Sequence, residues 1–331
     1  MKTPNAATGC PPGFDSLQQA AEWFALLRSD TVSDEDHRAW QHWLGSSAEH
    51  REAWQRMETI GRRFSSLANV DGEGAASTLR TLRRERASRR RVLNTLVLAG
   101  GGTLLGWNLW RQQEWPQALI TGLRADFSTG VGEIRELTLD DGTRLWLNTA
   151  SAVDVALGSD SRQLWLHQGE LLIDTAADPR PFVVHTRHGS LRPLGTRFAV
   201  RQERDASWLA VYEGRVSISA GTQERILPAG SKTRFSTTTI ATPRATDENG
   251  VDWSRGVLRA DNMRLDALLL QLGRYRHGHL GVAPEVASLR VMGSFPLQDT
   301  DLALDMLESA LPVRVRRTLP WWVSIMAREP E

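Results

Sequence analysis

The sequence predicts a multi-domain protein with four parts: a small all-α domain, one transmembrane helix, an all-β domain and a small α+β domain. Three observations predict this fold class. Residues 92–110 contain no charged side chain. Before this run, apolar residues recur at helical spacing, and after it they alternate with a period of two. The single cysteine excludes a disulfide framework and a multi-thiolate metal site.

Residues 1–79 are predicted to form the all-α domain. Ser33 precedes three acidic residues and indicates a helix start, and Ser46 with Glu49 resembles a capping box that opens the next helix. Four tryptophans are many for so small a domain, so they either fill its core or face a partner. With Leu44, they are the candidate partner-binding residues: Trp23, Trp40, Trp43, Leu44 and Trp54. A DNA-binding helix-turn-helix does not fit, because the segment is acidic and lacks a basic recognition helix.

Residues 80–91 form a basic juxtamembrane segment with 7 Arg and 1 Glu, and residues 92–110 follow as the predicted span. Nineteen residues of helix are about 28 Å long, close to the thickness of the hydrocarbon core of a bilayer. The alternative, a buried core helix, would show regular polar positions. By the positive-inside rule the N-terminus is cytoplasmic and residues 111–331 lie outside. We therefore expect a single-pass protein of the bacterial inner membrane with a periplasmic C-terminus.

Residues 111–250 are predicted to be all-β, because short alternating strands are separated by turn signals. Three hairpins are expected: one around Asp141-Gly142, one within residues 164–173, and one around Glu213-Gly214.

Residues 251–331 are predicted to contain two βαβ-like halves. The expected elements are a strand at 256–259, a helix at 265–272 and a strand at 279–282, followed by a strand at 291–295, a helix at 302–311 and strands at 313–317 and 322–326.

The chain lacks the sequence motifs of the common hydrolases, metalloproteases and nucleotide-binding enzymes. Two histidine pairs, His185 with His188 and His277 with His279, have no further ligand at a supporting spacing. We therefore expect no metal, no cofactor and no enzyme with a separate substrate.

Several motifs resemble the FecR family of single-span regulators. In the N-terminal part they are A-A-E-W-F-x-L-L, W-x-x-W-L and A-E-H-R-E-A-W, and in the β region they include the run from Thr129 to Ser151, L-G-T-R-F-A-V and V-Y-E-G-R-V-S-I. The resemblance implies a β-solenoid-like periplasmic domain. The C-terminal part is similar to the short N-terminal domain of secretins and of TonB-dependent transporters.

The resemblance implies a regulator that binds an extracytoplasmic-function sigma factor in the cytoplasm. It also implies that the chain relays a periplasmic signal from the N-terminal signalling domain of an outer-membrane TonB-dependent siderophore receptor, with release by periplasmic and intramembrane proteases. No direct contact with nucleic acid is expected. Arg314, Arg316 and Arg317 flank a candidate sheet edge and are the receptor-binding candidates, although they could simply keep that edge soluble. An alternative function is an envelope secretion or peptidoglycan-associated binding protein.

Gly195-Thr196 resembles the pair at which some FecR-like regulators cleave themselves. The Thr196 hydroxyl would attack the Gly195 carbonyl, and water would open the resulting ester. Alternatively, Gly195 only marks a turn or bulge, and Thr196 is an ordinary strand residue.

Overall fold

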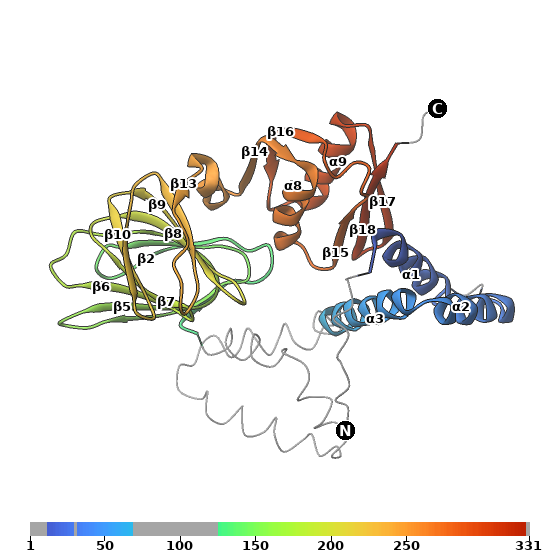
Figure 1. Ribbon diagram of the computed structural model, residues 1–331, viewed down its shortest axis with the longest axis horizontal. Helices are drawn as coiled ribbons and strands as arrows, with labels where there is room; N and C mark the ends of the chain where they lie inside the picture. The colour runs from blue at the N-terminus through green and yellow to red at the C-terminus, as the bar shows by residue number, and fades with distance from the viewer. Residues whose placement is uncertain (1–11, 30–31, 69–124, 329–331) are drawn as a thin grey trace, which may run out of the picture.

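The computed structural model describes residues 12–29, 32–68 and 125–328 (Figure 1). We name three parts of it: the helical domain (residues 12–68), the β domain (125–247) and the C-terminal unit (248–328). Figure 1 shows the C-terminal unit between the β domain and the helices. The predicted basic segment, residues 80–91, and the predicted span, residues 92–110, lie outside the described residues.

The helical domain consists of α1 (Phe14–Leu26), α2 (Asp34–Ser46) and α3 (Ala48–Ala68). The helix start predicted at Ser33 is confirmed, since Ser33 and Asp36 form a reciprocal capping box. The capping box predicted at Ser46 is wrong, because Ser46 is the last residue of α2. Its expected partner Glu49 instead accepts a 2.8 Å hydrogen bond from the backbone N–H of Gly13 at the start of α1.

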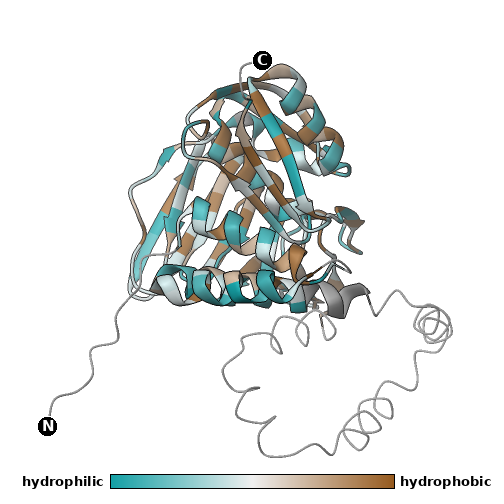
Figure 2. Ribbon diagram, turned by 90° about the vertical axis from the view of Figure 1, so that its right-hand side faces the viewer, coloured by the Kyte–Doolittle hydropathy of each residue, from teal (hydrophilic) through white to brown (hydrophobic). Residues whose placement is uncertain are grey.

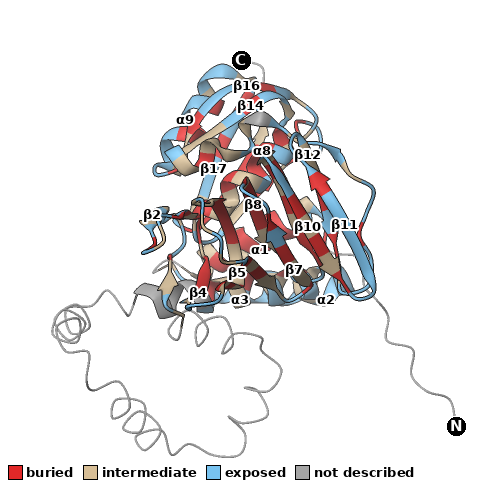
Figure 3. Ribbon diagram, turned by 90° about the vertical axis from the view of Figure 1, so that its left-hand side faces the viewer, coloured by how far each residue is buried: buried red, intermediate tan, exposed pale blue. Residues whose placement is uncertain are grey.

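The β domain consists of two seven-stranded sheets that share one strand, β5 (Arg162–Asp174), and enclose a common apolar core. One sheet has the order β11-β10-β7-β6-β5-β4-β1, and the other has the order β2-β3-β5-β8-β9-β12-β13. The remaining bounds are β1 Phe127–Ser128, β2 Arg135–Thr138, β3 Arg144–Leu147, β4 Ala152–Leu157, β6 Phe182–Thr186, β7 Gly189–Pro193, β8 Arg197–Gln202, β9 Ser207–Glu213, β10 Arg215–Ala220, β11 Gln223–Pro228, β12 Ser231–Phe235 and β13 Arg244–Ala245. Figure 3 shows the inner strands largely buried and β11 exposed at an edge.

Strand β5 passes from one sheet to the other at Gly169. Its residues 162–168 pair with β4, whereas residues 169–174 pair with β8. Gly169 has a φ of +86°, and a Cβ atom there would lie 2.2 Å from Ser151 Oγ. Only glycine therefore fits the point where β5 changes sheets.

Of the three predicted hairpins, the one around Asp141-Gly142 is confirmed, because β2 and β3 pair there in antiparallel register. The hairpin expected within residues 164–173 is wrong, since this segment is the continuous strand β5. The hairpin expected around Gly214 is also wrong. Strand β9 pairs with β8 and β12, whereas β10 pairs with β7 and β11, so Gly214 connects two sheets.

The C-terminal unit contains the predicted strands and helices, but its two halves are interleaved. The antiparallel pair β14–β16 joins the first strand of each half, and the three-stranded sheet β15-β18-β17 joins their last strands. The elements are η1 Glu248–Arg255, β14 Val257–Arg264, α8 Leu265–Leu272, η2 Gly273–Tyr275, β15 His279–Val282, β16 Arg290–Pro296, α9 Thr300–Ala310, β17 Val313–Leu319 and β18 Trp322–Ala327.

The helical domain packs on the C-terminal unit rather than standing alone. Leu17 and Phe24 of α1 share one apolar cluster with Trp321 and Trp322 from the β17–β18 turn and strand. Figure 1 places α1 beside β17 and β18, and Figure 2 shows that the helices nearest the viewer are mostly hydrophilic on their outer side. The apolar side of α1 therefore faces the C-terminal sheet.

The fold class predicted from the sequence is corrected by these findings. Among the residues that the structure describes, no helix is both long and apolar enough to cross a membrane. The helices of the N-terminal part are short, and most of the remainder is β-sheet. The β domain is not solenoid-like either, because its strand pairs are antiparallel except for β5–β6, whereas stacked solenoid coils place parallel strands side by side.

Candidate functional site

Helix α2 presents the most open surface of the helical domain. None of its side chains is buried, although Trp40, Trp43 and Leu44 are half-buried against its neighbours. An amphipathic helix normally buries its apolar stripe in the core of its own domain. The partly open apolar side of α2 is therefore available to another molecule.

The tryptophans of the helical domain have two roles. Trp40 and Trp54 lie 5.0 Å apart between ring centroids, and Trp54 contacts Phe24, so these rings hold α2 and α3 to α1. Trp43 lies at the rim, where it stacks on His50 at 4.5 Å and its indole N–H donates to Gln19 Oε1. Trp23, on α1, is half-buried.

Polar contacts accompany the apolar contact between α1 and the C-terminal sheet. Gln18 donates to Thr318 Oγ1 at 3.1 Å and accepts from Ser324 Oγ at 2.7 Å. Glu22 forms a 2.9 Å ion pair with Arg316. Since both side chains of this pair are about half exposed, it orients the two surfaces more than it stabilises them.

The three arginines predicted to bind a receptor all lie on β17, which is the edge strand of its sheet. Arg316 is paired with Glu22, and Arg317 lies 2.8 Å from Asp305 of α9. Arg314 is exposed. The structure thus places these arginines along one sheet edge, close to the docked helix α1.

Gly195 and Thr196 form a tight bend just before β8. Gly195 has a φ of +67°, and Thr196 is buried. The backbone N–H of Thr196 donates to the Thr175 hydroxyl, which in turn donates to the Thr196 carbonyl oxygen. The Thr196 hydroxyl is shielded from solvent and has no hydrogen-bond partner among the described residues. Gly214 passes so close that a Cβ atom there would lie 2.3 Å from the Gly195 carbonyl oxygen.

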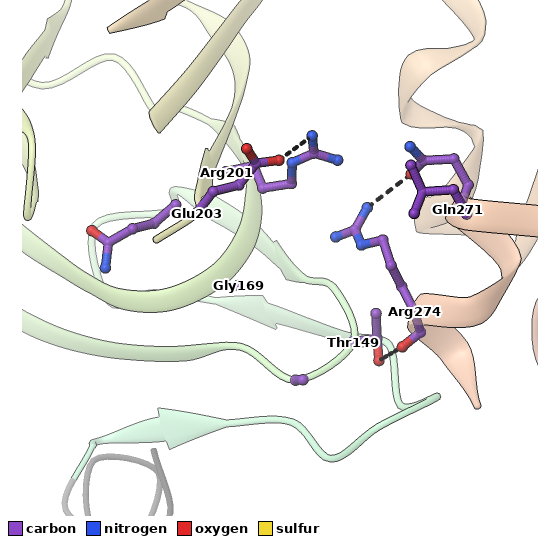
Figure 4. A pocket seen from close by; sticks show the side chains of 9 residues that line it. Thr149, Gly169, Arg201, Glu203, Gln271 and Arg274 are labelled. Carbon is purple, nitrogen blue, oxygen red and sulfur yellow. Dashed lines mark hydrogen bonds and ion pairs between the residues drawn. The ribbon is translucent and has the colours of Figure 1, made fainter. Parts of the chain in front are cut away.

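A cavity of about 430 Å³ lies where the β domain meets the C-terminal unit (Figure 4). Arg201 and Glu203 form a 2.5 Å ion pair on its β-domain side. Gln271 and Arg274 line the opposite side, and the Arg274 guanidinium reaches Glu170 at 2.6 Å. The sequence offered no signal for this site, because its residues are distant in the chain and match no motif.

Of the four histidines considered as metal ligands, His185, His188 and His279 lie in ordinary packing, and His277 is exposed. His188 Nδ1 is 2.9 Å from Ser207 Oγ, and His185 stacks on Trp165. His279 stacks on Trp322, and burial lowers the pKa of its imidazole to about 4. Over residues 12–29, 32–68 and 125–328, no three His, Cys, Asp or Glu side chains are grouped so that they could hold a metal ion.

Comparisons with known proteins find two matching families and two similar solved structures. Residues 125–217 match the family described as "FecR protein", and residues 18–60 match "Domain of unknown function (DUF4880)". No curated protein matches the chain. The fold is similar to two crystal structures of a candidate anti-sigma factor from Parabacteroides distasonis ATCC 8503, each 20% identical in sequence. The TM-scores are 0.48 and 0.50, with 61% of this chain and 97% or 98% of the other chain covered.

At 20% identity, the structural likeness bears on the fold alone, and the family match bears on the β domain. The motifs quoted from Thr129 onward lie within the matched residues, except for Ile218 at the end of V-Y-E-G-R-V-S-I. Residues 125–217 therefore match the FecR family, and the resemblance to this family predicted from the sequence is confirmed.

Proposed function

We propose that the chain is a sigma-factor regulator. Helix α2, through Trp43 and Leu44, binds an extracytoplasmic-function sigma factor. The observation that carries this proposal is the α2 surface, on which Trp43 and Leu44 remain partly accessible in an otherwise folded domain. Aromatic residues of this kind dominate the binding energy of protein interfaces. The description of the structural relatives as a candidate anti-sigma factor supports the proposal.

The charge of α2 fits a basic partner surface. Asp34, Glu35 and Asp36 occupy its first turn, and the first two of these side chains are exposed. Such charges accelerate the encounter with a basic partner and lose this effect as salt increases. We therefore expect an association rate that falls with ionic strength.

Co-purification of the full chain with an extracytoplasmic-function sigma factor tests this proposal. Trp43→Ala and Leu44→Ala should each reduce the amount of recovered complex, whereas Gln41→Ala, on an exposed position of the same helix, should not. If the wild-type chain recovers no sigma factor while remaining folded, the proposed function is wrong.

We further propose that the β domain and the C-terminal unit receive the signal. The proposed source is the N-terminal signalling domain of a TonB-dependent siderophore receptor, which would add to the β17 edge beside Arg314 and Arg317. Sheet edges pair readily with added strands, and arginines attract acidic partners. The expected proteases and the inner-membrane location stay predictions, and the location depends on residues 80–110.

Titrating the full chain with a purified receptor signalling domain tests this second step. Arg314→Glu should weaken binding most at low salt, and the control Arg264→Glu, in an exposed pair with Asp266, should not. Binding to peptidoglycan sacculi but not to the signalling domain would favour the alternative function instead.

Self-cleavage at Gly195-Thr196 is a second candidate activity, supported by the unpartnered, buried Thr196 hydroxyl. Its oxygen would form an ester with the Gly195 carbonyl carbon as the C–N bond breaks, leaving the proton on the Thr196 amine. Water would then release a Gly195 carboxylate and the Thr196 hydroxyl. Intact mass measurement should find two fragments for the wild type and for Thr196→Ser, and one species for Thr196→Ala. One intact species for the wild type would contradict this activity.

A further inference from the structure

The β domain and the C-terminal unit are joined by a buried polar cluster, which we name the junction cluster: Asn148, Glu170, Arg274 and Tyr275. The Tyr275 hydroxyl donates to Asn148 Oδ1 at 2.7 Å. Glu170 Oε2 accepts from Asn148 Nδ2 at 2.9 Å and from Arg274 at 2.6 Å. Each domain therefore supplies both charged and neutral members of one continuous hydrogen-bond network.

Burial makes these contacts costly to break. Asn148 is fully buried, Glu170 is 9% exposed and Tyr275 is 7% exposed. Burial also raises the pKa of the Tyr275 hydroxyl to about 12, so the hydroxyl remains a donor at all ordinary pH values. Removing one member leaves a buried partner unsatisfied, which costs more than the hydrogen bond itself contributes.

The backbone around the junction cluster is fitted to it. The Thr149 hydroxyl donates to the Arg274 carbonyl at 3.1 Å and accepts from the Gly132 N–H at 2.8 Å. A Cβ atom on Gly132, which has a φ of +82°, would lie 2.9 Å from the Tyr275 carbonyl oxygen. Hence the backbones of the β-domain loop around Gly132 and of η2 lie too close together to admit a side chain at Gly132.

The space beside the junction cluster is loosely filled. Two cavities, one of about 430 Å³ (Figure 4) and one of about 320 Å³, share Arg201, Gln271 and Arg274 in their walls. Leu172 and Ala199 add apolar contact with the C-terminal unit, but apolar burial has no directional preference. The polar contacts of the junction cluster are therefore what fixes the relative orientation of the two domains.

We propose that Asn148, Glu170, Arg274 and Tyr275 are positioning residues that hold the C-terminal unit in one orientation on the β domain, and that a protein partner docking on the C-terminal unit acts on the β domain through them. The claim that a docked partner acts on the β domain rests on the proposed function. Arg201, opposite Glu170 in the β5–β8 ladder, lies near the end of β8, and β8 begins directly after Gly195-Thr196. Strand β8 thus runs from the ladder partner of Glu170 back to that bend.

Hydrogen–deuterium exchange of the purified full chain tests the positioning role. The variants are Tyr275→Phe, which removes one hydroxyl, and Glu170→Gln, which keeps the shape and removes the charge. In both variants, the backbone amides of residues 148–151 and 272–276 should exchange at least about 10-fold faster than in the wild type. Tyr275→Phe loses the neutral hydrogen bond to Asn148, and Glu170→Gln loses the charge that pairs with Arg274. Residues 164–168 in the same β domain should exchange as in the wild type. The control Arg264→Gln, which breaks the exposed pair with Asp266, should change neither segment.

Unchanged exchange at 148–151 and 272–276 in Tyr275→Phe overturns the proposal, as does a uniform increase over the whole β domain, because the cluster would then only stabilise the fold. If Glu170→Gln does not fold, Tyr275→Phe decides alone.

The transmission half of the proposal, that a docked partner acts on the β domain through the junction cluster, is tested by adding a receptor signalling domain. Binding that changes exchange at 148–151 in the wild type but not in Tyr275→Phe supports it, and binding without any change at 148–151 in the wild type contradicts it. Failure of that domain to bind refutes the receptor proposal and the transmission half, while the positioning role stands on the exchange data.

Discussion

Gly169 lies against Ser151 so closely that a Cβ atom on Gly169 would be 2.2 Å from the Ser151 hydroxyl oxygen and 2.5 Å from its Cα atom. This contact is made where β5 leaves one sheet and enters the other. Gly169→Ala should therefore destabilise the β domain by roughly 3 kcal/mol or more, from the left-handed backbone and the steric overlap together.

Chemical denaturation of the two matched glycine variants separates these effects. Gly230 also has a positive φ, +75°, but a Cβ atom there would meet nothing within 4 Å. Gly230→Ala should cost only about 1–2 kcal/mol, the price of the backbone conformation. Equal losses for the two variants would show that the contact with Ser151 is not tight.

Asp141 and Arg162 form a buried ion pair at 2.9 Å, with side chains 0% and 5% exposed. Asp141→Asn should lower the free energy of unfolding by about 3 kcal/mol, because Arg162 loses its nearest carboxylate partner. Asp140→Asn, at the exposed neighbouring position, is the control and should have little effect. Urea denaturation at pH 7 measures both values, and similar values for the two variants would contradict the prediction.

The same pair predicts an acid dependence. Burial opposes ionisation of Asp141, but hydrogen bonds from Arg162 and Thr143 outweigh it and lower its pKa below the usual 3.8. A lowered folded-state pKa means that the carboxylate contributes stability above the unfolded pKa and that this contribution is lost as pH falls through the folded value. Wild-type stability should therefore decrease below about pH 4, and Asp141→Asn should decrease less. Parallel pH profiles would contradict this assignment.

Trp322 is 1% exposed and packs with Leu17 and Phe24 of α1. Trp322→Ala should cost about 3–5 kcal/mol and should release α1, which hydrogen exchange at residues 14–26 would detect. Trp165→Ala, in the β domain, should destabilise that domain without changing exchange in α1. Unchanged protection of α1 in Trp322→Ala would show that the helix does not need this surface.

His279 stacks on Trp322 and makes the contact between α1 and the C-terminal unit sensitive to pH. Its pKa is lowered to about 4, chiefly by burial and also by Arg56, so the folded protein keeps the imidazole neutral. Between the usual pKa of 6.5 and about 4, the unfolded chain binds more protons, so stability should fall as pH is lowered through this range. His279→Gln should flatten the profile of thermal stability between pH 7 and pH 4, and an unchanged profile would contradict the assignment.

Local patterns predicted the elements of the C-terminal unit well. The alternation near Val291 and the apolar helix at 265–272 each appear in the structure, because strand and helix periodicity are properties of short segments. The same logic failed at Gly169 and Gly214. A glycine between two alternating runs fits a hairpin turn and a passage between sheets equally well, and only distant strands decide between them.

Long-range contacts account for what the sequence did not predict at the candidate sites. Nothing local indicates that Trp321 and Trp322 complete the core under α1, or that Tyr275 reaches Asn148. The tryptophans of the helical domain were identified from composition, but composition did not separate Trp54, whose ring packs on Phe24, from Trp43, whose indole N–H donates to Gln19.

The affinity of the full chain for a purified extracytoplasmic-function sigma factor tests the central claim most directly. We predict measurable binding by the wild type, and a loss of roughly 30-fold or more when Trp43 and Leu44 are both replaced by alanine, as expected for residues at the centre of an interface. Gln41→Ala should bind like the wild type. The account is contradicted if the folded wild-type chain does not bind, or if the double variant binds as tightly as Gln41→Ala.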